Sequence, residues 1–195
     1  MNIADLFPDA SEDLARLHRV LERSAERDGI LDVAYRTIDT PVGALLLAAT
    51  EVGLVRVAYA SQGFNMVLAD LANRISPRIL CAPARLDSAA HEIDEYFSGR
   101  RTHFDLPLDL ALSTGFRRKV LEHLRELGYG ARESYAAVAA GLGNPRAVRA
   151  VGTACGHNPI PVVIPCHRVV RSDGTLGGYI GGMDAKNILL TLEAA

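Results

Sequence analysis

Three consecutive residues, Cys166, His167 and Arg168, bring a thiol, an imidazole and a guanidinium together in the sequence. A free thiol has a pKa of about 8.5 and is mostly protonated at neutral pH, but a neighbouring imidazole or cation favours the nucleophilic thiolate. The three residues lie inside an apolar run of the kind that forms a buried strand, where unpaired polar groups are costly. The run therefore predicts a cysteine activated for nucleophilic attack. The Cys-His pair alone also fits a buried hydrophobic cysteine followed by a core histidine.

The residue before the cysteine, Pro165, decides whether the thiol and the imidazole can meet. Successive side chains of a strand point to opposite faces, so an extended backbone would separate the two groups. Proline fixes its own φ and biases the preceding residue away from helix. We therefore expect the chain to leave the strand at Pro165 and to turn through Cys166 and His167, which restores their contact.

The composition fits one large domain or two small ones, because 195 residues with 49% hydrophobic content can bury a proper core. The net charge of −2 argues against a polybasic binder of any nucleic acid, but it allows a small local DNA-binding surface. No segment approaches the roughly 20 apolar residues of a membrane span. The first ten residues lack the basic and apolar regions of a signal peptide. We expect a cytoplasmic protein without a membrane partner.

The three cysteines, Cys81, Cys155 and Cys166, are odd in number and lack the spacing of a disulfide framework, which suits a reducing compartment. Structural zinc sites usually leave two to four residues between paired ligands. Here Cys155 and His157 are separated by one residue, and Cys166 and His167 by none. We therefore expect neither a metal site nor a cofactor.

The first 110 residues are predicted to form a helical extension (1–30) and an α/β domain (31–110). Residues 8–29 are typical of an amphipathic helix with Asp9 as a candidate N-cap. Its apolar stripe comprises Leu14, Leu17, Leu21 and Ala25. Between residues 30 and 60 the apolar period becomes two, which predicts a three-stranded antiparallel meander. The further elements expected are a helix at 64–76, a strand at 78–82 with Cys81 in the core, a helix at 87–98 and an extended edge segment at 102–108.

From residue 111 to residue 195 the pattern is mainly helical. The expected helices run from Ser113 or Thr114 to Leu127, over 134–142, over 145–156, and over 183–195 with Ile188, Leu189 and Leu192 on the apolar side. The second and third form a helix-turn-helix candidate, in which Asn144 would be the N-cap and Pro145 would start the helix. Five glycines between residues 171 and 182 indicate a loop that tolerates close backbone approach.

The helix expected over 145–156 has an arc of small residues. At about 100° per residue, Val148, Val151 and Cys155 share a face that should be buried. The opposite arc carries Arg146, Arg149, Ala150, Thr153 and Ala154. A face without bulk suits the minor groove, which is only about 6 Å wide, rather than base readout in the major groove. The alternative is a helix that simply exposes small residues to water.

The string Pro165-Cys166-His167-Arg168 resembles the active-site motif of the O6-alkylguanine-DNA alkyltransferases, also called methylated-DNA-protein-cysteine methyltransferases. The resemblance covers most of residues 32–193. Its other matching segments are Ser134-Tyr135, Asn144-Pro145, Arg149-Ala150-Val151-Gly152, Asn158-Pro159-Ile160-Pro161 and Gly178-Tyr179-Ile180-Gly181-Gly182. It implies an α/β (α+β) fold: a ribonuclease-H-like N-terminal domain with an antiparallel sheet and helices, and a helical C-terminal domain that binds DNA through a helix-turn-helix.

The resemblance also implies roles for individual residues. Cys166 would accept the alkyl group, and His167 would take the thiol proton through a water. Glu193 would hold and polarise His167, Asn158 would bridge the histidine region and the turn, and Tyr135 would rotate the 3′ phosphate and assist the leaving guanine. Arg149 would fill the gap left by the flipped nucleotide. The implied DNA contacts are Tyr135, Arg146, Ala147, Arg149, Ala150 and Thr153, and the implied pocket residues are Pro161, Val169, Tyr179, Ile180 and Gly181.

The activity implied is irreversible, stoichiometric transfer of an alkyl group from O6 of guanine, and from O4 of thymine, to the protein's own thiolate. The expected partner is double-stranded DNA that contains O6-alkylguanine, bound by a monomer that can cluster on DNA. The nucleotide would be flipped through the minor groove, so we expect the sulfur at the mouth of a pocket that a swung-out purine can enter.

Two other functions stay open at the level of the sequence. An alkyltransferase-like damage sensor would bind alkylguanine without transfer, but such relatives lack the cysteine that stands here at Cys166. A cysteine hydrolase would need an oxyanion hole and usually a distant histidine. The sequence departs from the family at several positions. Ile180 stands where a small or hydroxyl residue is common, Leu121 where an aromatic is common and Gly128 where a proline is usual. Glu193 lies two residues from the C-terminus, where helices fray.

Overall fold

The sheet of the N-terminal half is built from strands whose apolar side chains alternate between two faces. In the computed structural model, which describes residues 10–194, β1 (Val33–Ile38), β2 (Leu45–Ala49) and β3 (Leu54–Tyr59) form an antiparallel meander. β4 (Ile79–Cys81) pairs with β1 in parallel, which gives the order β3-β2-β1-β4. The predicted meander and the additional strand are both confirmed.

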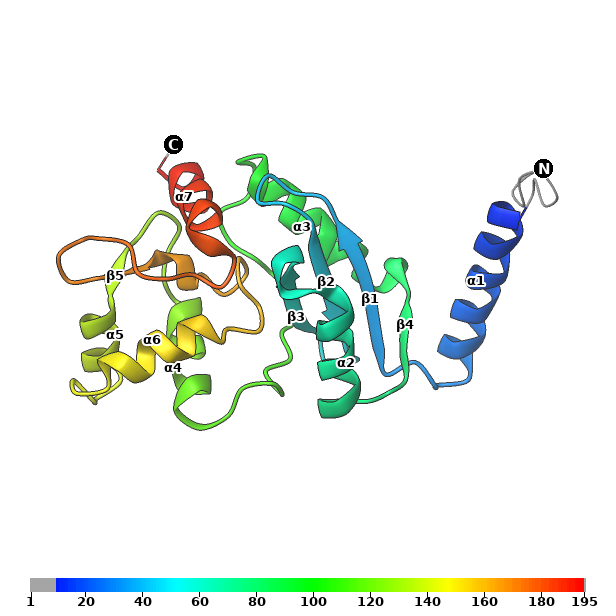
Figure 1. Cartoon of the computed structure of the whole chain (residues 1–195), viewed down its shortest axis with the longest axis horizontal. Coiled ribbons are helices and arrows are strands. Elements are labelled where there is room, and N and C mark those ends of the chain that lie inside the picture. Colours follow the sequence, from blue (N-terminus) through cyan, green and yellow to red (C-terminus); the bar gives the residue numbers. More distant parts are fainter. Residues whose placement is uncertain (1–9, 195) are drawn as a thin grey trace.

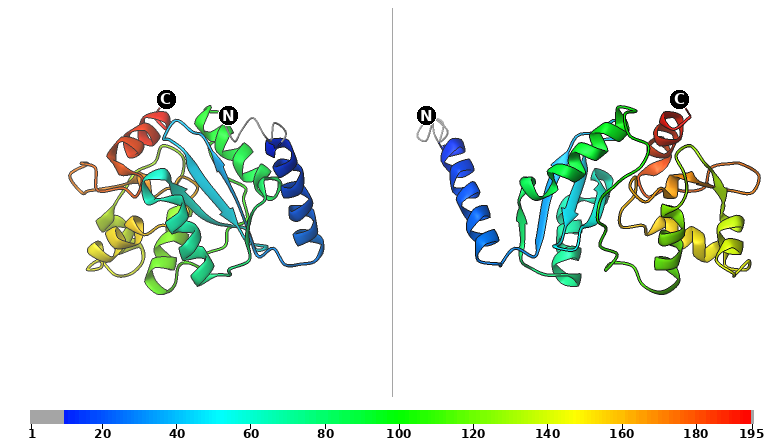
Figure 2. Two further views of the ribbon diagram at one scale, coloured as in Figure 1. Left: turned by 45° about the vertical axis from the view of Figure 1, so that its right-hand side comes forward. Right: turned by 180° about the vertical axis from the view of Figure 1, so that it is seen from behind.

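Helices cover both faces of this sheet (Figures 1 and 2). The even-numbered side chains of β2 pack in one apolar cluster with α2 (Phe64–Arg74). Its odd-numbered side chains pack in a second cluster with α3 (Asp87–Phe97) and with the C-terminal half. Because both sides are covered, all five residues of β2 are buried. Two short 3₁₀ helices, η2 (Ala60–Gln62) and η3 (Pro83–Leu86), precede α2 and α3.

The N-terminal helix, α1 (Ala10–Arg27), lies beside β4, at the end of the molecule away from the C-terminal half (Figure 1). Its predicted apolar stripe faces mostly outward: Leu14, Leu17 and Leu21 are 66%, 57% and 52% exposed, and only Ala25 is buried. The inner contact is instead made by His18, whose ring bonds the Cys81 carbonyl. The expected N-cap, Asp9, lies outside the described residues. Within residues 10–194, no helix has the length and apolar character needed to cross a membrane.

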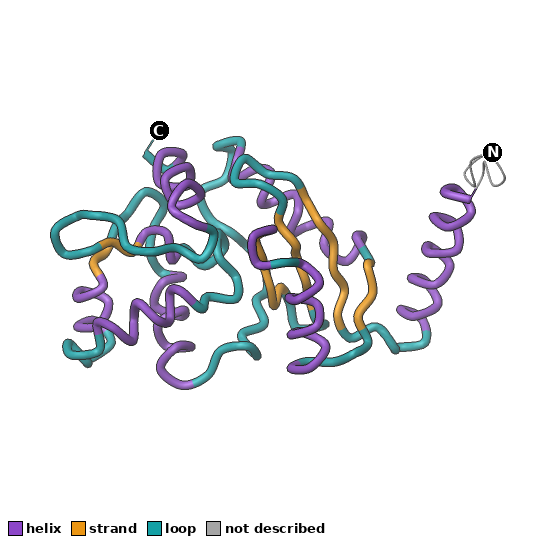
Figure 3. Tube along the Cα trace, viewed as in Figure 1, coloured by secondary structure: helices purple, strands orange, loops and turns teal. Residues whose placement is uncertain are grey.

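The C-terminal half is mostly helix and loop (Figure 3). Its helices are α4 (Gly115–Arg125), α5 (Tyr135–Gly141), α6 (Val148–Gly156) and α7 (Gly182–Leu192). α6 packs against both α4 and α5. Two short strands, β5 (Glu133–Ser134) and β6 (Val169–Val170), pair in parallel and tie the start of α5 to the segment directly after Arg168.

The start of α6 was predicted wrongly. Asn144 does not cap a helix that begins at Pro145; instead, the Ala147 amide bonds the Asn144 carbonyl in a turn, and Ala147 is the N-cap. The residues from Asn144 to Ala147 therefore form a connection between the helices. The shorter helix changes which residues face solvent, as described below.

The apolar run before the cysteine is also not a strand. Its residues form a turn in which the Ile164 amide bonds the Ile160 carbonyl, and Val162 adopts a φ of +74°. A positive φ is strained for a β-branched residue. The run is nonetheless buried, as predicted, because the turn packs into the same apolar cluster as the sheet.

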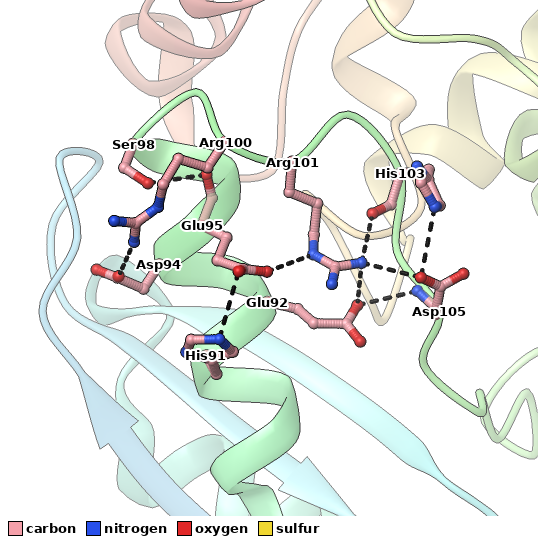
Figure 4. A network of polar contacts seen from close by, with 9 residues as sticks. All are labelled: His91, Glu92, Asp94, Glu95, Ser98, Arg100, Arg101, His103 and Asp105. Carbon is pink, nitrogen blue, oxygen red and sulfur yellow. Dashed lines mark hydrogen bonds and ion pairs between the residues drawn. The ribbon is translucent and has the colours of Figure 1, made fainter.

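A polar network fixes α3 to the segment that leads from one half to the other (Figure 4). Arg101 forms ion pairs with Glu92 at 3.3 Å, Glu95 at 2.9 Å and Asp105 at 3.1 Å. Beyond it the chain is extended, as predicted, and runs beside β3, where the Leu54 amide bonds the Pro107 carbonyl at 2.8 Å. This connection positions the C-terminal half against the face of the sheet that carries α3.

Candidate active site

Cys166 begins a one-turn 3₁₀ helix, η4 (Cys166–Arg168), directly after Pro165. The chain thus turns through the cysteine and the histidine directly after Pro165, as the sequence predicted. The cysteine is buried, with only 2% of its surface exposed. It is not surrounded by apolar groups alone, because Asn158 Nδ2 donates a hydrogen bond to its sulfur at 3.1 Å.

Asn158 is fully buried and connects three parts of the turn. Besides the bond to the sulfur, its Nδ2 donates to the Ile164 carbonyl at 2.9 Å. Its Oδ1 accepts the Ile160 amide at 3.0 Å. One amide side chain therefore fixes both the shape of the apolar turn and the position of the thiol.

The resting thiol is protonated, which corrects the expectation of a thiolate. Burial raises the pKa of Cys166 to about 11, although the Asn158 hydrogen bond and the charge of Lys186 lower it. The neighbouring cation, Arg168, does not help, because both of its nitrogens that reach the site bond the carboxylate of Glu193. A nucleophilic sulfur thus requires that the proton leave when the substrate is bound.

His167 lies in the same turn and offers a lone pair. Its Nε2 donates to Glu193 Oε1 at 2.9 Å, a carboxylate oxygen that can only accept, so Nε2 carries the proton of the neutral ring. Burial lowers the pKa of His167 despite Glu193, which keeps the ring neutral near pH 7. Its Nδ1 is buried and has no hydrogen-bond partner among the described residues. The turn therefore holds a neutral base with one open nitrogen, without a direct bond to the sulfur.

Glu193, at the C-cap of α7, is buried and accepts five hydrogen bonds. Oε1 accepts from Tyr96 Oη at 2.7 Å, from His167 Nε2 at 2.9 Å and from Arg168 Nη2 at 2.8 Å. Oε2 accepts from Arg168 Nε at 2.9 Å and from the Gly130 amide at 3.3 Å. Burial alone would raise the pKa of Glu193, but the bonds from His167 and Arg168 lower it to about 2. The carboxylate is therefore firmly held although it is close to the chain end.

The inner face of α7 contains a lysine that the sequence analysis did not single out. Lys186 is fully buried, and its Nζ donates to the carbonyls of Val169 at 2.7 Å and Gly177 at 3.4 Å. The predicted apolar side was partly wrong, because Ile188 is exposed at 39%. The spacing of Lys186 and Glu193, seven residues apart, places them on one helix face and was the available signal.

Two tyrosines of the N-terminal half reach the site and were also missed. Tyr96 of α3 bonds Glu193, as described above. Tyr59, the last residue of β3, has its hydroxyl 2.9 Å from that of Tyr179. A Cβ on Gly181 would collide with the Tyr59 ring, so this position must be glycine or the ring must move. Neither contact had a signal in the sequence, because each joins residues about a hundred positions apart.

A pocket of about 430 Å³ opens beside the glycine-rich loop. Its lining includes Tyr135, Arg171, Tyr179 and Ile180, together with residues of α6. A Cβ on Gly177 would collide with the Tyr135 hydroxyl, so the loop can approach the tyrosine closely only because this residue is glycine.

The other predicted pocket residues do not line this cavity. Pro161 and Val169 are buried, and Gly181 lies against Tyr59. Cys166 is not among the lining residues either, so the expectation that the sulfur stands at the pocket mouth is wrong for this state. The thiol is covered in this structure.

Most residues of the arc predicted to face outward on α6 are exposed to solvent. Arg149, Ala150 and Thr153 are exposed on the helix, while Arg146 and the half-buried Ala147 lie in the turn before it. Two residues differ from the prediction. Ala154 is buried, and Val148, at the first position of the shortened helix, is 37% exposed and borders the pocket.

The three cysteines are free thiols. In the part of the chain that the structure describes, no three His, Cys, Asp or Glu side chains are grouped to hold a metal ion. The side chains brought together at the site include a buried thiol, a neutral imidazole and an ionised carboxylate.

Two family models match the chain. That of the 6-O-methylguanine DNA methyltransferase ribonuclease-like domain matches residues 33–110, and that of the 6-O-methylguanine DNA methyltransferase DNA binding domain matches residues 115–195. The methylated-DNA-protein-cysteine methyltransferase of Mycolicibacterium paratuberculosis is 39% identical over 161 residues, which are 83% of this chain and 92% of that protein.

Solved structures give the same result. The Mycobacterium tuberculosis O6-methylguanine methyltransferase superposes with a TM-score of 0.73 at 38% identity, over 83% of this chain and 92% of that one. The structure of Mycobacterium tuberculosis OGT in complex with DNA superposes with a TM-score of 0.72 at 39% identity, over 82% of this chain and 92% of that one.

Proposed function

Because this chain belongs to the methylated-DNA-protein-cysteine methyltransferases, DNA-binding enzymes that repair DNA by alkyl transfer, we propose that Cys166 is the residue that accepts the alkyl group. The observation that carries the proposal is the open Nδ1 of a neutral His167 in the same turn as the buried thiol. The turn contains the nucleophile and a base, and Asn158 orients the nucleophile.

The transfer step follows from these groups. The thiol proton passes to His167 Nδ1 through a water, because no direct bond joins ring and sulfur among the described residues. The resulting thiolate attacks the O6-alkyl carbon in line. A new sulfur–carbon bond forms as the carbon–oxygen bond of the substrate breaks, and guanine leaves with the electron pair of that bond. Glu193 stabilises the imidazolium that forms, because the carboxylate stays ionised. Tyr135, which remains protonated because burial raises its pKa to about 12, can donate a hydrogen bond to the leaving base.

The substrate base has to leave the duplex first. A sulfur that is 2% exposed cannot reach an O6 atom inside a base stack. Flipping a nucleotide costs a few kcal/mol, and the cost is reduced when a side chain takes the vacated place. In this proposal the exposed residues of α6 lie in the minor groove, Arg149 fills the gap, and the purine enters the pocket lined by Tyr179 and Ile180.

The reaction is stoichiometric in this account. The thioether product is stable, and the other thiols are not placed to remove the alkyl group: Cys81 lies on β4, and Cys155 is buried on α6 with a pKa raised by burial. We propose O6-alkylguanine in double-stranded DNA as the main substrate and O4-alkylthymine as a second one. The protein would act as a monomer that can cluster along DNA.

The proposed organisation has three parts: an N-terminal extension (1–30), an α/β domain (31–110) and a DNA-binding and transfer domain (111–195). The two family matches, at 33–110 and 115–195, support this division. α5 and α6 would form the helix-turn-helix. A thiol nucleophile needs a reducing compartment, and the free state of all three cysteines supports the cytoplasm.

The stoichiometry of repair tests this function. The protein is titrated with a duplex that carries one O6-methylguanine, and restored guanine is counted per molecule of protein. We expect restoration to stop at one guanine per protein. Binding without restoration would instead identify a damage sensor, and restoration well beyond one would identify a hydrolytic enzyme. A duplex with unmodified guanine serves as the control for binding.

A further inference from the structure

We propose that Tyr96, on α3 of the N-terminal half, is a positioning residue for the transfer reaction, because its hydroxyl holds the carboxylate that orients the His167 ring. The inference rests on the proposed function, since it assigns His167 as the acceptor of the thiol proton. It adds a group from outside the C-terminal half to the residues on which the reaction depends.

The contact is direct and buried. Tyr96 is fully buried, and its Oη donates to Glu193 Oε1 at 2.7 Å. The same oxygen accepts the Nε2 proton of His167 at 2.9 Å. Burial, followed by the charge of Glu193, raises the pKa of Tyr96 far above its usual value, so the hydroxyl stays protonated and can act as a donor. The tyrosine is therefore one bond away from the group that fixes the imidazole.

The helix that carries Tyr96 is held so that this hydroxyl has little freedom. The ring packs against Phe97 and Phe104, with centroids 5.3 Å away in each case, and against Tyr129 at 6.1 Å. The ion pairs of Arg101 with Glu92 and Glu95 fix the same part of α3 to the connecting segment (Figure 4). A hydroxyl positioned by a rigid helix can keep the carboxylate in one rotamer.

Loss of the hydroxyl has a defined electrostatic consequence. A carboxylate with one donor fewer is a stronger base and presents more negative charge to the imidazole. The pKa of His167 then rises, so the ring becomes protonated, and unable to accept the thiol proton, at a higher pH than in the wild type. Hydrogen bonds to charged groups are stronger than those between neutral groups, so loosening of this one should slow transfer roughly tenfold or more even where the ring is neutral.

Other charged and titratable groups face the His167–Glu193 pair from each neighbouring element. They are Arg168 in η4, Lys186 in α7, Cys166 in the turn, Tyr129 after α4 and Tyr179 in the glycine-rich loop. A Tyr96→Phe substitution changes none of them and leaves the ring in place. A change in the pH profile can therefore be assigned to the lost hydroxyl.

Tyr129 supplies a matched control. Its ring lies in the same aromatic cluster, but its hydroxyl donates to the Leu192 carbonyl at 3.1 Å and not to the carboxylate. Tyr129→Phe therefore removes one hydroxyl close to the site without removing a donor from Glu193. A merely structural role for Tyr96 predicts that the two variants behave alike.

The experiment measures the single-turnover rate of methyl transfer from an O6-methylguanine duplex as a function of pH, for the full-length wild type, Tyr96→Phe, Tyr129→Phe and Glu193→Gln. We expect Tyr96→Phe to lower the plateau rate and to move the acid limb to higher pH. Tyr129→Phe should keep the wild-type limb. Glu193→Gln should lower the plateau further and move the limb to lower pH, because it removes the negative charge beside the ring.

If Tyr96→Phe keeps the acid limb of the wild-type pH profile while Glu193→Gln shifts it, the role of Tyr96 is overturned and the proposed function is left intact. A wild-type protein that restores no guanine would overturn both. Thermal unfolding checks that each variant is folded.

A second measurement needs no variant. In ¹⁵N-histidine-labelled wild type, NMR should show His167 with a proton on Nε2 and an NOE from that proton to the Tyr96 hydroxyl proton. Absence of that NOE would also contradict the inference.

Discussion

The buried cluster around Cys166 and the exposed face of α6 differ in how firmly their side chains are held. In the cluster, Asn158, His167 and Glu193 are each held by hydrogen bonds that exist without DNA. On α6, Arg149 and Ala150 are exposed and contribute shape rather than fixed contacts. In the proposed mechanism, the groups for transfer are therefore held in place by the fold, whereas α6 offers an exposed face to DNA.

Substitution of Cys166 should distinguish the two regions most strongly, because it affects transfer and not binding. Cys166→Ala should abolish methyl transfer, because no other thiol is placed beside His167, and it should still bind a damaged duplex, because α6 is unchanged. Binding is measured by fluorescence anisotropy and transfer by restored guanine. A variant that loses binding as well would show that the two regions are not independent, and Cys81→Ala is the control with full activity expected.

Glu193→Gln tests how far the buried cluster also stabilises the fold. Glu193 has a pKa of about 2 in the protein against an ordinary 4.5, so it contributes stability that is present above pH 4.5 and is lost as the pH falls toward 2. That difference corresponds to about 3 kcal/mol. Urea unfolding should show the variant less stable by about this amount at pH 7, with the gap narrowing between pH 4.5 and 2. A gap that stays constant in this window would contradict the prediction.

On the other side of the comparison, Arg149→Ala should slow repair in duplex DNA roughly tenfold, since stacking on a base is worth about 1–3 kcal/mol. Transfer from the free base O6-benzylguanine should be nearly unchanged, because no stack has to be filled. Arg146→Ala, in the turn before α6, is the matched control and should mainly reduce the salt dependence of binding. Equal losses on duplex and free base would remove the role of Arg149.

The smallest expected effect concerns Lys186. Its charge lowers the pKa of Cys166, so Lys186→Met should raise that pKa further and slow transfer a few-fold at pH 7. An ultraviolet titration of the thiolate in the variant and the wild type measures the shift directly. An unchanged thiol pKa would mean that the lysine only fastens the carbonyls of Val169 and Gly177.

Local signals made the reactive turn and the sheet predictable. Pro165 indicated that the chain turns through Cys166 and His167, although the apolar run before it proved to be a turn and not a strand. Strand alternation between residues 33 and 59 specifies the meander, because it depends on neighbours in the sequence. The start of α6 could not be predicted in this way. Pro145 fits a helix start and a turn equally well, and packing selected the turn.

Long-range packing accounts for what the sequence did not reveal at the site. Tyr96 and Glu193 are 97 positions apart, and Tyr59 and Tyr179 are 120 apart, so no local pattern links them. The burial of Cys166, and with it the raised thiol pKa, likewise results from contacts between distant segments. The sequence therefore pointed to the groups that we propose to react, whereas their protonation states required the fold.

The central claim is that the Cys166 sulfur receives the alkyl group. The most direct measurement is peptide mass mapping of the full-length protein after reaction with a duplex that carries O6-methylguanine. The account predicts one added methyl group, located on the peptide that contains Cys166, and none on those that contain Cys81 or Cys155. A methyl group on either of the other cysteines, or repaired DNA with an unmodified protein, would contradict it.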